Sequence, residues 1–261
     1  HILQYNYEDG SPIEPTYYLP IIPMLFVNGS KGIGTGFSTD IPCYNPKDLV
    51  QWIRTWLSNR TSSESTPLPL LKPWYRGFKG SIDVDKDTVY YKGIVHKEKD
   101  GVFRIKELPI GTWTDSYKDN VLSKLKENKR IQKWNEYSTT NDVSIQVFTK
   151  NDIQLKDKSY KLISTSKLSN MNAFNSNNKL QEYNGIVEML NEYCNVRLNA
   201  YQKRKDFLIS QWSNELKVLK CKLNFIQKVI DNISLFKFNE DKLIDLFIKS
   251  NYVKKDNSYS Y

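Results

Sequence analysis

The sequence has 261 residues, with 38 Lys and Arg against 29 Asp and Glu, and a formal net charge of +9 at pH 7. This length allows two domains or one domain with an extended element, and the basic excess suits an anionic partner such as nucleic acid, although plain solvated lysines would also produce it. There is no apolar run long enough to cross a bilayer and no signal-peptide pattern. The sequence has only two histidines, so catalysis by a Ser/His or Cys/His pair is close to excluded.

The front of the chain is rich in turn-forming residues. All ten prolines lie at or before Pro109, and ten of the eleven glycines lie at or before Gly111. We expect residues 1–15, which are polar, to be the continuation of a longer chain. An apolar run then leads into a loop in which Ile33 and Lys31 stand among glycines at positions 29, 32, 34 and 36.

The residues of this loop leave two interpretations open. In the first, a tight turn tucks Ile33 into its own core. In the second, Ile33 is a wedge that enters the minor groove of DNA, while Lys31 and backbone amides contact phosphates. A nucleotide-binding loop is disfavoured, because no lysine precedes Thr35 and because Thr39 stands where a dinucleotide-binding loop needs its third glycine.

The next elements mix helix and strand patterns. The pair Asn45–Pro46 is typical of a helix start and precedes an apolar stripe, and residues 61–69 form a Ser/Thr/Pro linker. We expect Trp113 to be a core residue. The remaining predicted elements are strands within residues 88–95, 101–108 and 143–149, a helix over 114–129, and a connector over 170–178.

Residues 180–235 predict one long helix. Its apolar stripe advances by alternate steps of four and three residues, a mean of about 3.5, which is the coiled-coil spacing; the positions are Trp212, Leu216, Leu219, Leu223, Ile226, Ile230 and Ile233. The helix would be roughly 80 Å long and needs a partner from outside this chain. Cys194 and Cys221 would lie about 40 Å apart on it, so they are expected to be reduced, intracellular thiols. Asn239 is predicted to cap a further helix.

Five segments, in order along the chain, resemble type IIA DNA topoisomerases of the eukaryotic kind. They are EPTYYLPIIPMLFVNGSKGIGTGFSTDIPCYN (14–45), FKGSI (78–82), ELPIGTWTDSYK (107–118), YKLISTSKLSNMNAF (160–174) and NEYCNVRLNAYQKRKDFL (191–208). The resemblance implies an α+β fold in which a DNA-bending loop and a mixed α/β tower domain precede a long coiled-coil helix. The implied domains are the end of the winged-helix region with the glycine-rich DNA-bending loop (1–45), the tower (46–178), the first coiled-coil arm (179–236) and the start of the C-gate (237–261).

The resemblance also implies roles for individual residues. In this family the loop isoleucine enters the minor groove and bends the DNA, and Ile33 matches it as the DNA-intercalating residue. The predicted DNA-binding residues are Asn28, Lys31, Gly32, Gly34, Thr35, Lys79 and Lys118. No catalytic residue and no metal ligand are expected in this chain, because the family's catalytic tyrosine lies upstream of Glu14. The segment is expected to bind no cofactor, whereas the intact enzyme would use Mg²⁺ and ATP.

The implied activity is passage of one duplex through a transient double-strand break, with this segment gripping and bending DNA but unable to cleave it alone. The implied partners are double-stranded DNA, a second copy in a homodimer, and the rest of the chain, including the returning coiled-coil helix; no membrane is involved. The expected location is intracellular: the nucleus for a cellular protein, and the host nucleus or a cytoplasmic replication site for a viral one. A non-enzymatic architectural DNA-binding protein with a coiled-coil dimerisation arm remains the alternative, and a purely structural coiled-coil protein would show no DNA affinity.

Overall fold

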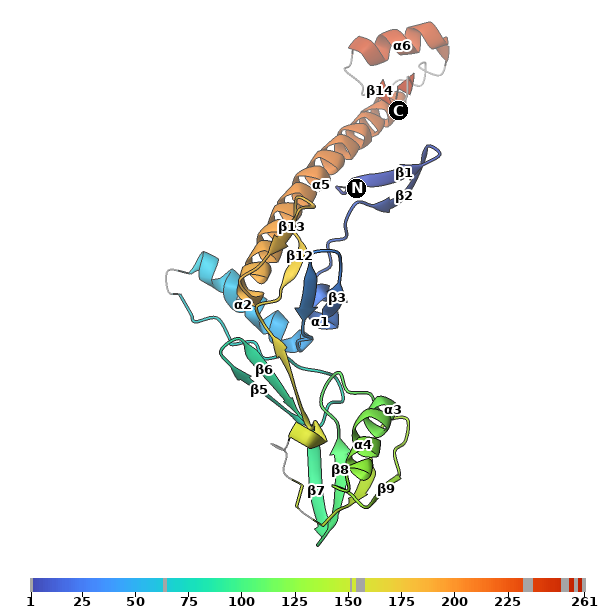
Figure 1. Ribbon diagram of the computed structural model, residues 1–261. Helices are drawn as coiled ribbons and strands as arrows, with labels where there is room; N and C mark the ends of the chain where they lie inside the picture. The colour runs from blue at the N-terminus through green and yellow to red at the C-terminus, as the bar shows by residue number, and fades with distance from the viewer. Residues whose placement is uncertain are drawn as a thin grey trace. The chain divides into compact units, whose positions relative to one another are not determined.

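The computed structural model describes residues 2–62, 65–150, 152–153, 158–231, 237–249, 254–255 and 258–259. Short strands and helices precede one long helix, which confirms the predicted α+β class (Figure 1). The helical elements are α1 (Met24–Asn28), α2 (Pro46–Thr61), α3 (Thr114–Tyr117), the π-helical η1 (Lys118–Leu122), α4 (Ser123–Glu127), the 3-10 turn η2 (Lys158–Tyr160), α5 (Ile186–Asp231) and α6 (Glu240–Lys249).

The strands are short and pair antiparallel throughout the described residues. They are β1 (Tyr5–Glu8), β2 (Ser11–Pro15), β3 (Ser30–Ile33), β4 (Ser38–Ile41), β5 (Ser81–Asp85), β6 (Thr88–Lys92), β7 (Ile94–Lys99), β8 (Val102–Glu107), β9 (Lys133–Glu136), β10 (Ile145–Phe148), β11 (Ile163–Lys167), β12 (Asn172–Phe174), β13 (Leu180–Glu182), β14 (Lys254–Lys255) and β15 (Ser258–Tyr259). Contacts divide the chain into a central unit, residues 19–194, and a terminal unit, residues 1–18 with 195–261.

Helix α2 begins at the predicted pair Asn45–Pro46. The Asn45 side-chain oxygen accepts a hydrogen bond from the backbone N–H of Lys47 at 2.9 Å, and proline occupies the first helical position, where no donor is lost. The stripe of α2 buries Leu49 and Trp52. They belong to the first core of the central unit, which also contains Phe26, Ile41, Tyr44, Met171, Tyr183, Met189, Leu190 and Cys194.

Two sheets form the rest of the central unit, one with the strand order β7-β8-β10-β9 and the other with the order β11-β6-β5. The predicted run 88–95 is divided between them at Gly93, where a Cβ atom would lie 2.4 Å from the carbonyl oxygen of Glu107. The continuous helical segment α3–η1–α4 packs on the four-stranded sheet around a second core. Within that core the buried Tyr117 hydroxyl donates to the carbonyl of Tyr160 at 2.7 Å.

Helix α5 has 46 residues and confirms the long predicted helix, although it starts later than expected. The predicted start at residue 180 is wrong, because Leu180–Glu182 pairs with β12 as strand β13 and Gly185 follows with a φ of 118°. The described part of the predicted stripe, from Trp212 to Ile230, is 52–67% exposed. Ile233 lies outside the described residues. A helix of this length spans about 70 Å.

Helix α6 belongs to the terminal unit and begins at the predicted cap. The backbone N–H of Lys242 donates to the Asn239 side chain at 3.3 Å, and Phe247 is buried with its ring 5.6 Å from that of Phe225 on α5. No helix in the described parts of the chain is both long enough and apolar enough to span a bilayer. The four-domain division expected from the resemblance remains a prediction.

Candidate nucleic-acid interface

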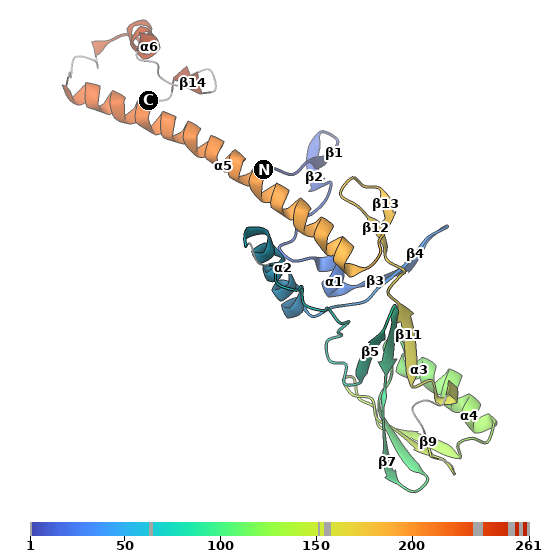
Figure 2. The same cartoon turned by 90° about the vertical axis from the view of Figure 1, so that its left-hand side faces the viewer.

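Ile33 is the last residue of β3, and it stands at the end of a narrow hairpin. Strands β3 and β4 pair so that Ile33 lies opposite Ser38, and the next pair is closed by a hydrogen bond from the N–H of Gly34 to the carbonyl of Phe37 at 2.8 Å. Between them Gly36 has a φ of 83°, a conformation that favours glycine. In Figure 2 the hairpin extends away from helices α1 and α2. The sequence therefore folds this segment into a projecting arm.

The side chain of Ile33 is 93% exposed, so it does not fill a core in the described structure. The tight-turn interpretation that buries Ile33 in its own core is thus wrong. An isoleucine held at the end of a hairpin in this way costs solvation free energy unless a partner covers it. The wedge interpretation of Ile33 stays a prediction.

Two glycines of the loop differ in what the fold requires of them. Gly29 has a φ of 68°, and a Cβ atom there would lie 2.8 Å from the carbonyl oxygen of Ile41. Both the backbone conformation and the close contact therefore favour glycine at this position. Gly32 has neither constraint, since a Cβ atom there would meet no atom within 4 Å. Glycine inside a strand often marks a place where another molecule approaches the backbone closely. The open space over Gly32 is suited to such an approach.

Lys31 lies on the same face of the hairpin as Ile33, because side chains two residues apart along a strand share a face. Its Nζ is 3.4 Å from the Asp40 carboxylate on β4, and the Lys31 side chain is 80% exposed. An exposed pair of this kind contributes little to stability, so the ammonium group can exchange Asp40 for another anion.

The remaining predicted loop residues lie before the hairpin and in its turn. Asn28 ends α1 with an exposed side chain, and its carbonyl accepts a hydrogen bond from the Cys43 thiol at 3.1 Å. Burial raises the pKa of that thiol. Thr35 is exposed in the turn, and nothing beyond Phe37 lies within 4 Å of the Cβ position of Gly34.

Asn170 and Asn172 hold this arm in place, although the sequence predicted only a connector over residues 170–178. The Asn170 amide donates to the Ser38 hydroxyl at 3.0 Å, and the Asn172 amide donates to the Ser38 carbonyl at 2.8 Å. The Asn170 carbonyl also accepts the backbone N–H of Asp40 at 2.9 Å. No sequence signal tied these residues to the loop, because they lie more than a hundred residues away from it.

The two predicted DNA-binding lysines outside the loop are both engaged by carboxylates. The Lys79 ammonium pairs with Asp142, which raises its pKa. The Lys118 ammonium lies 2.7 Å from Asp115 and 2.6 Å from Glu136, and these hydrogen bonds raise its pKa. Its side chain is only 18% exposed. Neither lysine belongs to the β3–β4 hairpin, and their contact with DNA stays a prediction.

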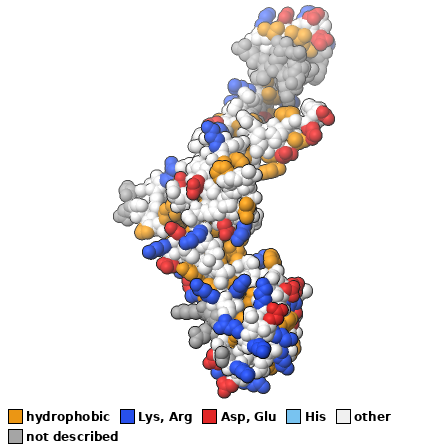
Figure 3. All heavy atoms as spheres, viewed as in Figure 1, with side chains coloured by type: hydrophobic (Ala, Val, Ile, Leu, Met, Phe, Trp, Pro, Cys, Tyr) orange, Lys and Arg blue, Asp and Glu red, His pale blue; other side chains and the backbone are white. Residues whose placement is uncertain are grey.

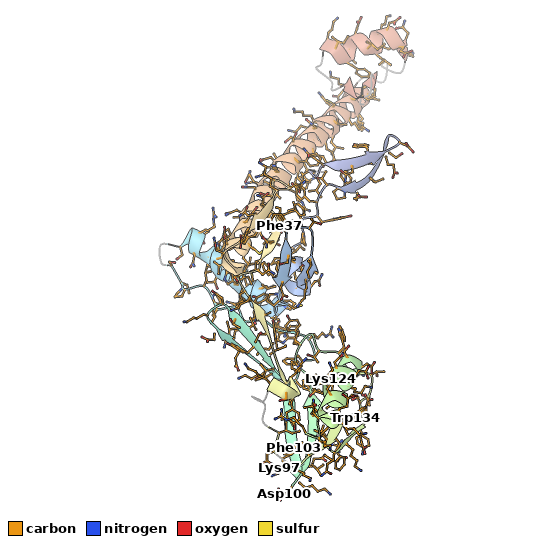
Figure 4. The ribbon with its side chains drawn as sticks, in the orientation of Figure 1. Phe37, Lys97, Asp100, Phe103, Lys124 and Trp134 are labelled. Atoms are coloured by element: carbon orange, nitrogen blue, oxygen red, sulfur yellow. The ribbon has the colours of Figure 1, made fainter. Side chains whose placement is uncertain are left out.

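Other basic side chains lie on the surface around the four-stranded sheet. Figure 3 shows Lys and Arg there with acidic side chains among them. The exposed lysines include Lys124, Lys126, Lys129 and Lys133, and Figure 4 labels Lys124 on α4. At the β7–β8 turn Lys97 pairs with Asp100 at 2.8 Å, so charge of both signs occurs at that end.

Trp113 is 78% exposed, so the prediction that it is a core residue is wrong. It stands immediately before α3 with an extended backbone (φ −83°, ψ 140°), and the helix that follows buries Tyr117 in its place. Among the described residues no group of three or more His, Cys, Asp or Glu side chains could hold a metal ion.

Comparison with known proteins gives a consistent result. Residues 1–255 match the family model for the A-type subunit of DNA gyrase/topoisomerase IV. The chain is 37% identical over 240 residues to DNA topoisomerase 2 of Plasmodium falciparum, covering 88% of this chain and 17% of the relative. It is 31% identical to DNA topoisomerase 2 of Acanthamoeba polyphaga mimivirus, covering 95% of this chain and 25% of the relative.

A solved structure agrees with these relatives. The crystal structure of the Plasmodium falciparum topoisomerase II DNA-binding, cleavage and re-ligation domain matches with a TM-score of 0.80 and 32% identity, covering 99% of this chain and 37% of that one. The chain thus spans only a quarter or less of the length of these two curated relatives.

Proposed function

Since the chain belongs to the DNA gyrase/topoisomerase IV family, with relatives named DNA topoisomerase 2, we propose that it is the part of a type II DNA topoisomerase that grips and bends a duplex. The observation that carries this proposal is the exposure of Ile33 at the end of the β3–β4 hairpin. Family membership favours this function over a non-enzymatic architectural DNA-binding protein and over a purely structural coiled coil.

The hairpin would bend DNA by entering the minor groove. Proteins that insert an apolar side chain between base steps lose a few kcal/mol of stacking and gain a bent duplex that contacts more protein surface. Ile33 would be the inserted side chain, and the open backbone at Gly32 would let the groove walls approach. Lys31 would leave Asp40 and contact a phosphate, with Asn28, Gly34 and Thr35 beside it.

The bent duplex would then extend over the region proposed as the tower, residues 46–178. Lys79 and Lys118 are the proposed contacts there, and each would exchange a carboxylate for a phosphate. Lys31 is also paired with a carboxylate, but its side chain is 80% exposed, against 58% for Lys79 and 18% for Lys118. We therefore expect Lys79 and Lys118 to contribute less to DNA affinity than Lys31.

The intact enzyme would pass one duplex through a transient double-strand break, with ATP and Mg²⁺ bound by regions outside these residues. The described residues offer no cluster of metal ligands, so no step of metal chemistry is assigned to them. We also propose that this segment alone does not cleave DNA, because none of its tyrosines lies in the motif that carries the catalytic tyrosine of the family. The exposed stripe of α5 would pair with a returning helix of the same chain, within a homodimer at an intracellular site.

Fluorescence transfer across an end-labelled duplex tests the proposal. The intact protein should shorten the distance between the labels, and the variant Ile33→Ala should bind with most of the wild-type affinity but leave the duplex straight. Equal bending by both proteins would rule out Ile33 as the wedge.

A further inference from the structure

The tip of the β3–β4 hairpin carries a second exposed apolar side chain, Phe37, which is 57% exposed. Figure 4 labels this residue on the hairpin. Neither sequence reasoning nor the function proposed above uses it. The exposure of Phe37 requires an explanation, because leaving aromatic surface in water costs solvation free energy.

The pairing of the strands decides which way Phe37 faces. Ile33 lies opposite Ser38, so these two side chains share one face of the hairpin. Phe37 lies directly before β4, and its hydrogen bond with Gly34 continues the pairing of the two strands by one step, so we infer that the alternation of faces extends to Phe37. The hairpin tip therefore carries one apolar side chain on each face, Ile33 on one and Phe37 on the other.

Two neighbours of Phe37 at the tip are glycines and contribute no side chain to cover its ring. Its cross-strand partner is Gly34, which is joined to it by the N–H···O bond of 2.8 Å, and Gly36 precedes it. A Cβ atom built at Gly36 would meet nothing within 4 Å. Glycines on both sides therefore supply no side chain to cover the ring. Phe37 is 57% exposed and Ile33 is 93% exposed, so the ring of Phe37 is partly covered and presents a smaller share of its surface to solvent.

We propose that Phe37 is a second DNA contact, which packs against the deoxyribose wall of the minor groove beside the step that Ile33 opens. A hairpin that enters the groove edge-on places its two faces against the two flanks of the kink. The more exposed Ile33 reaches between the bases, whereas the less exposed ring of Phe37 meets the sugars. Deoxyribose rings offer the same apolar surface in every DNA sequence. This contact therefore stabilises the bent duplex without contributing sequence specificity. The inference rests on the proposed bending function.

The test compares five forms of the intact protein on one end-labelled duplex: wild type, Ile33→Ala, Phe37→Ala, Phe37→Trp and Phe174→Ala. Phe174 is the matched control, an exposed phenylalanine on strand β12 of the same unit. Bending is measured by fluorescence transfer, and complex lifetime by dilution into unlabelled competitor. Phe37→Ala should keep the wild-type bend and dissociate about fivefold to tenfold faster, the range for loss of part of an apolar side-chain contact. Phe37→Trp should restore the lifetime, and Phe174→Ala should match wild type.

Three results would overturn the inference. If Phe37→Ala dissociates at the rate of Phe174→Ala while Ile33→Ala loses bending, the sugar contact is wrong and the proposed function stands. If Phe37→Ala loses bending as completely as Ile33→Ala, the ring is itself inserted or sets the hairpin shape. If the wild-type protein bends no duplex, both the proposed function and the inference are wrong.

Discussion

The side-chain amide of Asn172 donates a hydrogen bond to the backbone carbonyl of Ser38 at 2.8 Å, across 134 residues of sequence. Ser38 lies directly opposite Ile33 in the β3–β4 ladder, so this bond fixes the strand beside the exposed isoleucine. Asn170 adds a second bond, to the Ser38 hydroxyl. If Ile33 acts as the proposed wedge, it can bend DNA only from a rigid base, and we expect these two asparagines to supply that rigidity from a distant segment.

Replacing both asparagines should therefore weaken bending without removing Ile33. The double variant Asn170→Ala with Asn172→Ala should show a smaller mean bend by fluorescence transfer, with a loss of unfolding free energy of about 1 kcal/mol for each exposed hydrogen bond. Asn177→Ala, in the same connector, is the control and should behave as wild type. An unchanged bend in the double variant would mean that the hairpin is rigid without these bonds.

Gly29 and Gly32 should respond in opposite ways to the same kind of substitution. Gly29→Ala introduces a clash with the Ile41 carbonyl and a left-handed conformation, and should lower the free energy of unfolding by at least about 1–2 kcal/mol. Gly32→Val meets open space, so thermal unfolding should stay near wild type while DNA affinity falls. Thermal denaturation and a binding titration separate the two effects. Retained DNA binding by Gly32→Val would contradict close approach at this position.

Lys31 should account for about one phosphate contact. The slope of log affinity against log salt should become shallower by about 0.9 in Lys31→Gln, because one fewer counterion is released from the duplex. Lys99→Gln, at the exposed end of β7, serves as the control and should keep the wild-type slope. Equal slopes for all three proteins would show that the Lys31–Asp40 pair stays closed on DNA.

The exposed stripe of α5 should be covered in the intact protein. Leu219→Asp places a charge on the stripe, whereas Lys217→Asp changes a neighbouring exposed position. If a returning helix packs there, Leu219→Asp should lower the melting temperature by several degrees and Lys217→Asp should not, because only the first buries an unpaired charge. Equal melting temperatures would mean that the stripe has no partner.

Local signals in the sequence predicted the elements that depend on neighbouring residues. Asn45–Pro46 set the start of α2, Asn239 set the start of α6, and the spacing from Trp212 onward predicted the exposed stripe of α5. These features follow from capping and helical periodicity, which act within a few residues.

The features that the sequence did not predict depend on contacts between segments that are distant along the chain. The pairing of Leu180–Glu182 with β12 replaced the expected first turn of the long helix. Lys118 meets Glu136 only because β9 returns beside the helix, and Asn172 meets Ser38 only in the folded chain. Trp113 was expected in the core, but it is exposed directly before α3, whereas Tyr117 of that helix is buried. Local pattern carries no information about such pairings.

Ile33 is proposed to open one base step, and unstacking at single steps tests this role most directly. A set of duplexes, each with 2-aminopurine at a different position, reports unstacking as an increase in fluorescence when the intact protein binds. We expect an increase confined to one step for the wild-type protein and no increase at any step for Ile33→Ala, with DNA still bound. The same increase in both proteins, or none in the wild-type complex, would contradict the wedge role of Ile33.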